Sequence, residues 1–334
     1  MKKIAFLINQ FKYSGILNQV VNLANSLSEI YKIEIICLEK LCDCELNKKV
    51  VLTELNYKNS VVKFINDRNI INELNNRLKD IDIVVFNESS FIKYIDKLEI
   101  NDKYKIYWMH TKYDVISDLK LFDKVVIPNK NISDSLILDN SKVIPNSIEI
   151  PKSITNYEVN NKLIFVGNLS KNKCINTLID MMSIINDKDN SVILNIIGDG
   201  GERSSILSHI KELGLSNNVF LLGSYNRDDL LDELRDSTLF VSTSDGEMFN
   251  LAILEAMSVG LPVVAFDNDS VNYMISDDID GKVIKDKNIN EMADVIISLL
   301  NDKNSRENLG GCAIEKSINF DVNVIKLEWV KLFK

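Results

Sequence analysis

Two series of short apolar runs, separated by longer stretches of helical periodicity, set the strongest limit on how this chain folds. Runs that are apolar throughout are typical of parallel strands that helices bury on both faces. The first series predicts strands over residues 4–8, 33–38, 81–86, 105–109, 124–127 and 142–144. The second predicts strands over residues 163–166, 192–197, 219–222, 239–242 and 262–265. The pattern therefore predicts two doubly wound α/β domains.

The segment over residues 144–162 separates the two series. It holds two of the four prolines and several polar residues, which is typical of a linker between domains. We therefore expect one domain over residues 1–150 and a second over residues 151–315. The amphipathic end of the chain, residues 316–334, is expected to form a helix that packs back on the first domain. Ligands of open parallel sheets bind at the carboxyl ends of the strands, so we expect both domains to face a central cleft.

Composition excludes several classes of protein. The net charge of −9 argues against a nucleic-acid binder, which needs a clustered basic face. No apolar run approaches the roughly 18 residues of a membrane span, and the first residues predict a buried strand rather than a signal peptide. Five scattered cysteines indicate a reducing cytoplasm rather than a disulfide scaffold. The acidic charge limits any contact with the inner membrane face to a peripheral, local patch.

The most informative segment is residues 238–267, TLFVSTSDGEMFNLAILEAMSVGLPVVAFD. It predicts a strand, a polar turn, a helix over residues 249–259 and a second buried strand. Glu255 lies among apolar residues inside that helix, and Glu247 precedes it. A carboxylate on a buried helix needs a partner. The sequence leaves two alternatives open for Glu255: a protein cation or backbone cap, or the hydroxyl groups of a ligand.

The spacing of these two acids favours a long ligand. Eight residues of continuous helix separate them by about 12 Å, whereas paired glycosidase carboxylates are roughly 5–10 Å apart. Between them, the amides of residues 248–251 would lie at a helix N-terminus, which attracts anions. This order of groups matches a sugar, a diphosphate and a ribose in sequence.

Glu247-x7-Glu255 resembles the E-x7-E motif of retaining glycosyltransferases of family 4, which have the GT-B fold. Four other segments resemble that family: FVGNLSKNKCINTLID (165–180), IIGDGGERSSI (196–206), VIPNSIE (143–149) and SGILNQVVNLANSL (14–27). The resemblance rests on the order and spacing of these motifs together and covers most of the chain. It implies a GT-B fold of two Rossmann-like domains, the first binding the acceptor and the second a nucleotide sugar.

The resemblance also implies a role for each residue of the site. Glu247 would hold hydroxyls of the donor sugar and Glu255 those of the ribose, while His110 would reach the donor sugar and Tyr225 would lie near the base. Negative charge develops on the departing diphosphate, so preorganised donors lower the barrier. These donors would be the side chain of Lys173, the backbone near Gly15 and the amides of Phe249, Asn250 and Leu251.

Several positions depart from the family pattern. Asn168 stands where the family usually has arginine, so it offers a hydrogen bond without a charge. Three alternatives follow: Lys173 stabilises more of the diphosphate charge, another cation such as Arg203 contributes, or activity is weak. Cys174 replaces a usual glycine. Met248 and Asn250 stand where the family often has glycines around the aromatic position, which favours a loop tuned to a particular sugar. Lys173, His110, Gly15 and Tyr225 each retain a plain alternative as a surface or packing residue.

Weaker motifs carry no function. Gly198-Asp199-Gly200-Gly201 lacks the third glycine of a dinucleotide fingerprint, since Arg203 occupies that position. Asp267-Asn268-Asp269 is interpreted as a loop, and Cys42-x-Cys44 has the wrong spacing for zinc. We therefore expect no metal and no other cofactor.

The hypothesis from the sequence is a cytoplasmic retaining glycosyltransferase of bacterial surface glycan synthesis. It would move a sugar from a nucleotide-sugar donor, UDP-sugar favoured, to a glycan, a lipid-linked saccharide or a protein. Asn168, Met248 and Ile16 favour the alternative of a non-catalytic partner-binding subunit with the same fold. An epimerase is the least favoured reading, and it would act on the donor alone.

Overall fold

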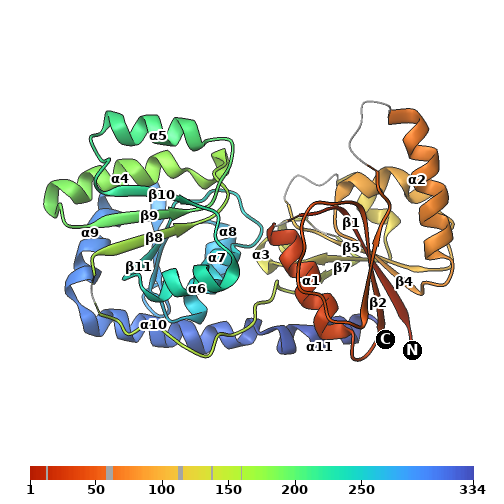
Figure 1. Ribbon diagram of the computed structural model, residues 1–334. Helices are drawn as coiled ribbons and strands as arrows, with labels where there is room; N and C mark the ends of the chain where they lie inside the picture. Colours follow the sequence, from red (N-terminus) through yellow and green to blue (C-terminus); the bar gives the residue numbers. More distant parts are fainter. Residues whose placement is uncertain (13, 58–62, 112–115, 137, 159) are drawn as a thin grey trace. The chain divides into compact units, whose positions relative to one another are not determined.

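The computed structural model describes residues 1–334 except 13, 58–62, 112–115, 137 and 159. The chain forms two compact units. Unit 1 comprises Met1–Ile148 together with Phe320–Lys334, and unit 2 comprises Glu149–Asn319. In each unit, helices cover both faces of a parallel sheet (Figure 1).

The sheet of unit 1 has seven parallel strands in the order β3-β2-β1-β4-β5-β6-β7. The chain adds strands outward from β1 first in one direction and then in the other, which is the doubly wound arrangement. Ligands of such sheets bind at the carboxyl ends of the strands. The strands are β1 (Lys3–Phe11), β2 (Lys32–Lys40), β3 (Val50–Glu54), β4 (Ile83–Phe86), β5 (Tyr104–Trp108), β6 (Lys124–Ile127) and β7 (Ser141–Val143). The helices are α1 (Gly15–Leu27), α2 (Lys63–Leu78), η1 (Ser89–Lys97), η2 (Ile116–Leu121), α3 (Lys130–Leu136), η5 (Ile318–Phe320) and α11 (Val322–Leu332).

The C-terminal helix α11 belongs to the core of unit 1. It packs against α1, and its Trp329 lies with its ring centroid 4.8 Å from that of Trp108 at the end of β5. Both tryptophans are almost fully buried. Aromatic pairs in this edge-to-face arrangement contribute about 0.5–1.5 kcal/mol beyond the area they bury. The segment is therefore a structural part of unit 1 rather than an appendage.

The sheet of unit 2 has six parallel strands in the order β10-β9-β8-β11-β12-β13. Helix α4 packs against α5 and α9, and α7 packs against α6 and α10, so the sheet is covered on both sides (Figure 1). The strands are β8 (Lys162–Val166), β9 (Ile193–Ile197), β10 (Val219–Gly223), β11 (Leu239–Ser242), β12 (Val263–Phe266) and β13 (Lys282–Ile284). The helices are η3 (Lys171–Lys173), α4 (Ile175–Lys188), α5 (Arg203–Glu212), α6 (Arg227–Arg235), α7 (Leu251–Ser258), α8 (Asp269–Met274), η4 (Lys285–Lys287), α9 (Ile289–Asn301) and α10 (Lys303–Ser317).

The predicted α/β class with two doubly wound sheets is confirmed, and every predicted strand is present. Strands β3 and β13 were not predicted, because both are short, lie at sheet edges and mix polar with apolar residues. Among the residues that the structure describes, no helix combines the length and apolarity needed to cross a bilayer.

Candidate active site

The loops that follow β8 and β9 form the floor of the candidate site in unit 2, and glycines let them pack backbone against backbone. The amide of Gly167 donates to Ile197 O at 2.9 Å. A Cβ added to Gly198 would lie 1.9 Å from Gly167 O, and one added to Gly200 would lie 2.5 Å from Leu169 O. Both distances are far below van der Waals contact, so these two positions require glycine. The glycines of this segment therefore serve the packing of two loops.

Lys173 and Glu247 form an ion pair at this edge of the sheet. Nζ of Lys173 contacts Oε1 of Glu247, and the two side chains are only 11% and 12% exposed. A Cβ at Gly167 would lie 3.2 Å from this Nζ, so glycine leaves the space that the lysine occupies. The burial of Lys173 excludes the alternative of a solvated surface lysine.

The second carboxylate oxygen of Glu247, Oε2, is buried without a hydrogen-bond partner among the described residues. Buried polar atoms are nearly always satisfied, so such an orphaned acceptor calls for an explanation. One hydroxyl group of a ligand would supply the missing donor. The Glu247 carboxylate can thus hold Lys173 and a ligand hydroxyl at the same time.

Two turns that are hydrogen-bonded to each other hold this pair in place. The Thr243 hydroxyl lies 3.0 Å from Cys174 O and 3.2 Å from Lys173 O, and the Asp245 amide donates to Asn172 O at 2.7 Å. Cys174 adopts a left-handed conformation with φ of 50°, which a glycine would adopt without strain. The position where the family pattern has glycine is therefore a strained one in this chain.

Helix α7 begins later than the sequence predicted. It starts at Leu251 instead of residue 249, because Asn250 adopts an extended conformation and its side chain accepts a hydrogen bond from the Ile253 amide at 3.3 Å. The separation of about 12 Å between Glu247 and Glu255 assumed a continuous helix, and that assumption is wrong, since the chain between Glu247 and Leu251 is not helical.

The N-terminus of α7 offers fewer free donors than expected. The Asn250 amide, expected from the sequence to face a ligand phosphate, donates here to Ser270 Oγ at 2.9 Å. Met248 is only 3% exposed. The amides of Leu251 and Ala252 have no acceptor among the described residues. Those two amides are therefore the free backbone donors at this helix end among the described residues.

Glu255 lies one turn into α7 and is partly exposed. Among the described residues its carboxylate has no hydrogen-bond partner and no ion-pair partner, so the alternative of a salt bridge or backbone cap is not observed. Burial raises the pKa of Glu255 to about 7, and Arg227 opposes this shift. Arg227 itself pairs with Glu149. The site thus holds a poorly solvated carboxyl group that hydrogen-bond donors of a ligand would stabilise.

Four further residues of unit 2 named from the sequence are partly or fully exposed. Asn168 is exposed, and its Oδ1 approaches within 2.6 Å of the position that a Cβ on Gly200 would take. Tyr225, between β10 and α6, is 37% exposed and Phe249 is partly exposed. Arg203, the first residue of α5, has no ion-pair partner in the described part of the chain.

Two residues named from the sequence lie in unit 1. Gly15 is the exposed first residue of α1, a helix that Ser14 caps by accepting from the Leu17 amide at 3.1 Å. His110 follows β5, and its ring lies 4.8 Å from that of Trp108. Desolvation lowers the pKa of His110 to about 3, so the imidazole is neutral near pH 7.

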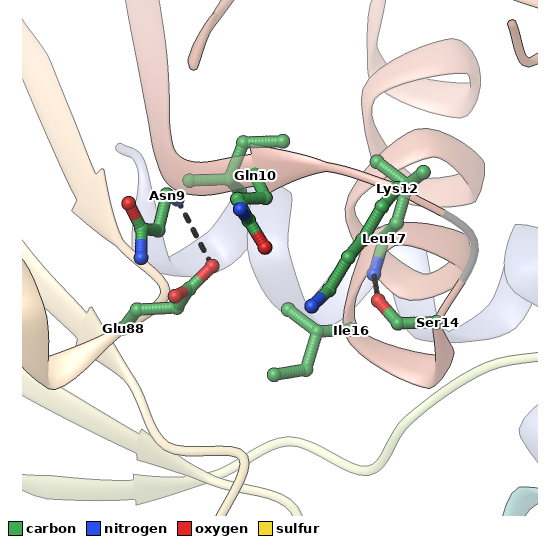
Figure 2. A pocket seen from close by; sticks show the side chains of 8 residues that line it. Asn9, Gln10, Lys12, Ser14, Ile16, Leu17 and Glu88 are labelled. Atoms are coloured by element: carbon green, nitrogen blue, oxygen red, sulfur yellow. Dashed lines mark hydrogen bonds between the residues drawn. The ribbon is translucent and has the colours of Figure 1, made fainter. Parts of the chain in front are cut away.

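A pocket in unit 1 was not predicted. It has a volume of about 250 Å³ and lies where β1 ends and α1 begins (Figure 2). Figure 2 shows Gln10 between Glu88, whose carboxylate accepts from the Asn9 amide at 3.0 Å, and Lys12. The lining residues are Ile8, Asn9, Gln10, Lys12, Ser14, Ile16, Leu17 and Glu88. The sequence carries one indication of this pocket, because polar residues directly follow two of the predicted strands.

The two doubly wound units define the GT-B class of fold. A family model of glycosyl transferases group 1 matches residues 146–316, just over half of the chain. The chain therefore belongs to the glycosyl transferases group 1 family.

Curated relatives show which proteins the chain resembles. Poly(ribitol-phosphate) alpha-N-acetylglucosaminyltransferase of Staphylococcus aureus (strain COL) is 29% identical over 244 residues, which cover 67% of this chain and 48% of the relative. Poly(glycerol-phosphate) alpha-glucosyltransferase of Bacillus subtilis (strain 168) is 31% identical over 147 residues, covering 44% of this chain and 22% of the relative. The chain thus spans about half, or less, of the length of these relatives.

Solved structures share the fold over the whole chain. A mutant of S. aureus TarM, in complex with Fondaparinux, alpha-GlcNAc-glycerol and UDP, superposes with a TM-score of 0.83 at 17% identity, and the match covers 100% of both chains. Anabaena Alr3699/HepE in complex with UDP and glucose gives a TM-score of 0.84 at 18% identity, covering 100% of this chain and 99% of the other. At these identities the likeness establishes the fold alone.

Proposed function

We propose that this protein is a retaining glycosyltransferase that moves a sugar from a UDP-sugar to a glycan or polyol-phosphate polymer. The observation that carries the proposal is the pair of carboxylates in unit 2, Glu247 with one orphaned oxygen and Glu255 with no partner, on either side of a helix N-terminus with free amides. The names of the curated relatives, and UDP in complexes of two structural neighbours, support this reading.

In this proposal each group has a chemical task. Glu247 accepts hydrogen bonds from the donor sugar, and Glu255 accepts them from the ribose. Lys173 and the amides of Leu251 and Ala252 stabilise the negative charge that develops on the leaving UDP, so no metal is needed for that task. The exposed ring of Tyr225 lies near the base.

From unit 1, we propose that the neutral imidazole of His110 contacts the donor sugar and that the backbone at Gly15 contacts the diphosphate. We further propose that the acceptor binds in the pocket of unit 1. Lys12 has no ion-pair partner among the described residues and would pair with an acceptor phosphate, while Glu88 and Gln10 would bind hydroxyls. All five cysteines are free thiols, which favours work in a reducing cytoplasm.

The experiment is nucleotide titration followed by transfer. We expect UDP and a UDP-sugar to raise the melting temperature, with GDP and ADP as base controls. Sugar transfer to poly(ribitol phosphate) and poly(glycerol phosphate) is then measured for the wild type, Glu247→Ala and Glu255→Ala, with the exposed Glu291→Ala as the matched control. Full transfer in both site variants would contradict the proposal.

One observation favours the alternative of a non-catalytic subunit: exposed Asn168 supplies no charge where the family pattern has arginine. If UDP does not bind at millimolar concentration, the alternative is supported. Asn168→Arg provides a direct check, because a bidentate clamp on the diphosphate should tighten UDP binding about tenfold.

The acceptor site has its own test. Lys12→Gln should raise KM for a polyol-phosphate acceptor and leave the Kd of UDP unchanged. Lys120→Gln, an exposed lysine outside the pocket of unit 1, is the matched control. An unchanged KM for Lys12→Gln would place the acceptor elsewhere.

A further inference from the structure

Asn87 is a buried amide whose orientation is fixed by the backbone around it. It follows β4 directly and is 2% exposed. Its Nδ2 donates to Leu7 O at 3.2 Å and to Val85 O at 3.3 Å. Rotating the amide by half a turn would place Oδ1 against two carbonyl oxygens, which repel it. The carboxamide oxygen of Asn87 therefore has one orientation.

That oxygen faces the ring of His110. Oδ1 of Asn87 lies 3.3 Å from Nε2 of His110. An amide oxygen only accepts hydrogen bonds, so the contact is attractive when Nε2 carries the proton. A neutral imidazole holds one proton, and desolvation keeps His110 neutral near pH 7. Nδ1 then carries a lone pair, and it has no hydrogen-bond partner among the described residues.

We infer that Asn87 is a positioning residue that holds His110 in the Nε2–H tautomer and so makes Nδ1 a hydrogen-bond acceptor. A half-turn of the ring would put Cε1 in place of Nε2 opposite Asn87, and the packing of the ring on Trp108 opposes that turn. An acceptor at this position recognises a hydroxyl proton and rejects a ligand group that offers only lone pairs. The use of Nδ1 toward a hydroxyl of the donor sugar rests on the proposed function, whereas the tautomer itself does not.

The tautomer can be read directly by NMR. Long-range proton–nitrogen correlation distinguishes the protonated ring nitrogen from the unprotonated one, and the chain has only two histidines. His209→Gln assigns the spectrum, because it removes the other ring, which contacts Asp180 in unit 2. In wild type we expect the Nε2–H form of His110 to predominate, with a small, measurable Nδ1–H population.

Asn87→Ala should raise the population of the Nδ1–H form about fivefold, the effect of losing a hydrogen bond of ordinary net strength. Asn140→Ala is the matched control: its Nδ2 also donates to two backbone carbonyls of unit 1, Leu119 O at 3.1 Å and Phe122 O at 2.8 Å, and it contacts no histidine in the described part of the chain. A population that Asn87→Ala leaves unchanged, or a wild type in the Nδ1–H form, would overturn the inference.

If Asn87→Ala does not fold, Asn87→Asp keeps the shape. Its carboxylate favours the doubly protonated ring, so His110 should then titrate at higher pH than in wild type; an unmoved titration contradicts the inference. In the transfer assay, Asn87→Ala should lower kcat/KM by the fraction of the Nε2–H form that the spectra show to be lost, and leave the Kd of UDP unchanged. The spectra need no substrate, so a wild type without transfer activity would refute the proposed function and leave the tautomer decided.

Discussion

Replacing Glu255 by glutamine should stabilise the protein at pH 8 and have little effect at pH 5. Burial raises the pKa of this carboxyl from an ordinary value near 4.5 to about 7. Each tenfold change in the ionisation constant corresponds to 1.36 kcal/mol, so ionising Glu255 in the folded state costs at most about 3 kcal/mol. Glutamine keeps the shape and removes the charge.

The direction of the pH dependence of stability follows from which state binds the proton. Between pH 4.5 and about 7 the folded protein holds a proton on Glu255 that the unfolded chain has lost, so stability falls as pH rises. Above pH 7 Glu255 is ionised in both states, and the free energy of unfolding falls no further for this reason. Glu255→Gln should therefore raise the free energy of unfolding above that of wild type by about 3 kcal/mol at pH 8 and by less than about 1 kcal/mol at pH 5.

Urea unfolding of wild type and Glu255→Gln at both pH values provides the measurement. Trp108 and Trp329 both lie in unit 1, so their fluorescence follows unit 1. Far-UV circular dichroism also follows unit 2, which contains Glu255. Glu291→Gln, on an exposed position of α9, is the control. A gain that is the same at both pH values, or a loss at pH 8, would refute the reasoning.

Three other predictions concern the same unit. Lys173→Ala leaves the Glu247 carboxylate buried without its cation, so the free energy of unfolding in urea should fall by about 3 kcal/mol. The double variant Lys173→Met, Glu247→Gln should restore most of that stability. Unchanged stability of the single variant would contradict the burial argument. Gly200→Ala should cost about 1–3 kcal/mol because its Cβ would meet Leu169 O. Gly201→Ala, whose Cβ would meet nothing within 4 Å, should stay within about 0.5 kcal/mol of wild type, and equal losses in a thermal melt would argue against the steric reason. Cys174→Gly should add about 0.5–1 kcal/mol by relieving the left-handed conformation at φ of 50°, and a lowered melting temperature would count against strain there.

The apolar runs predicted the sheets well because buried parallel strands need continuous apolar residues. The edge strands β3 and β13 lack such a continuous apolar run and were therefore not predicted. In β13 (Lys282–Ile284) only three residues pair, and the strand opens on a lysine. The start of α7 was misplaced for another reason: Asn250 caps the helix, and periodicity alone does not reveal which polar residue does so.

The site was predictable in part. Glu247 and Glu255 stood out as acids beside an apolar helix, but nothing in periodicity or composition brings Lys173 to Glu247, since the two lie in turns after different strands. The resemblance to a family supplied that residue. Neither source indicated that Ser270 engages the Asn250 amide or that Asn87 faces His110, because such contacts depend on side-chain geometry across strands.

The chain leaves unit 1 at Ile148 and returns to it at Phe320. Ile148 and the segment at Phe320 are already joined by backbone hydrogen bonds of 3.0 Å and 2.8 Å, so unit 2 is an insertion whose two ends meet. A chain that ends before residue 320 holds every residue of unit 2 but lacks Trp329, the partner that covers Trp108. A released chain truncated there should thus fold unit 2 and leave the Trp108 ring of unit 1 exposed.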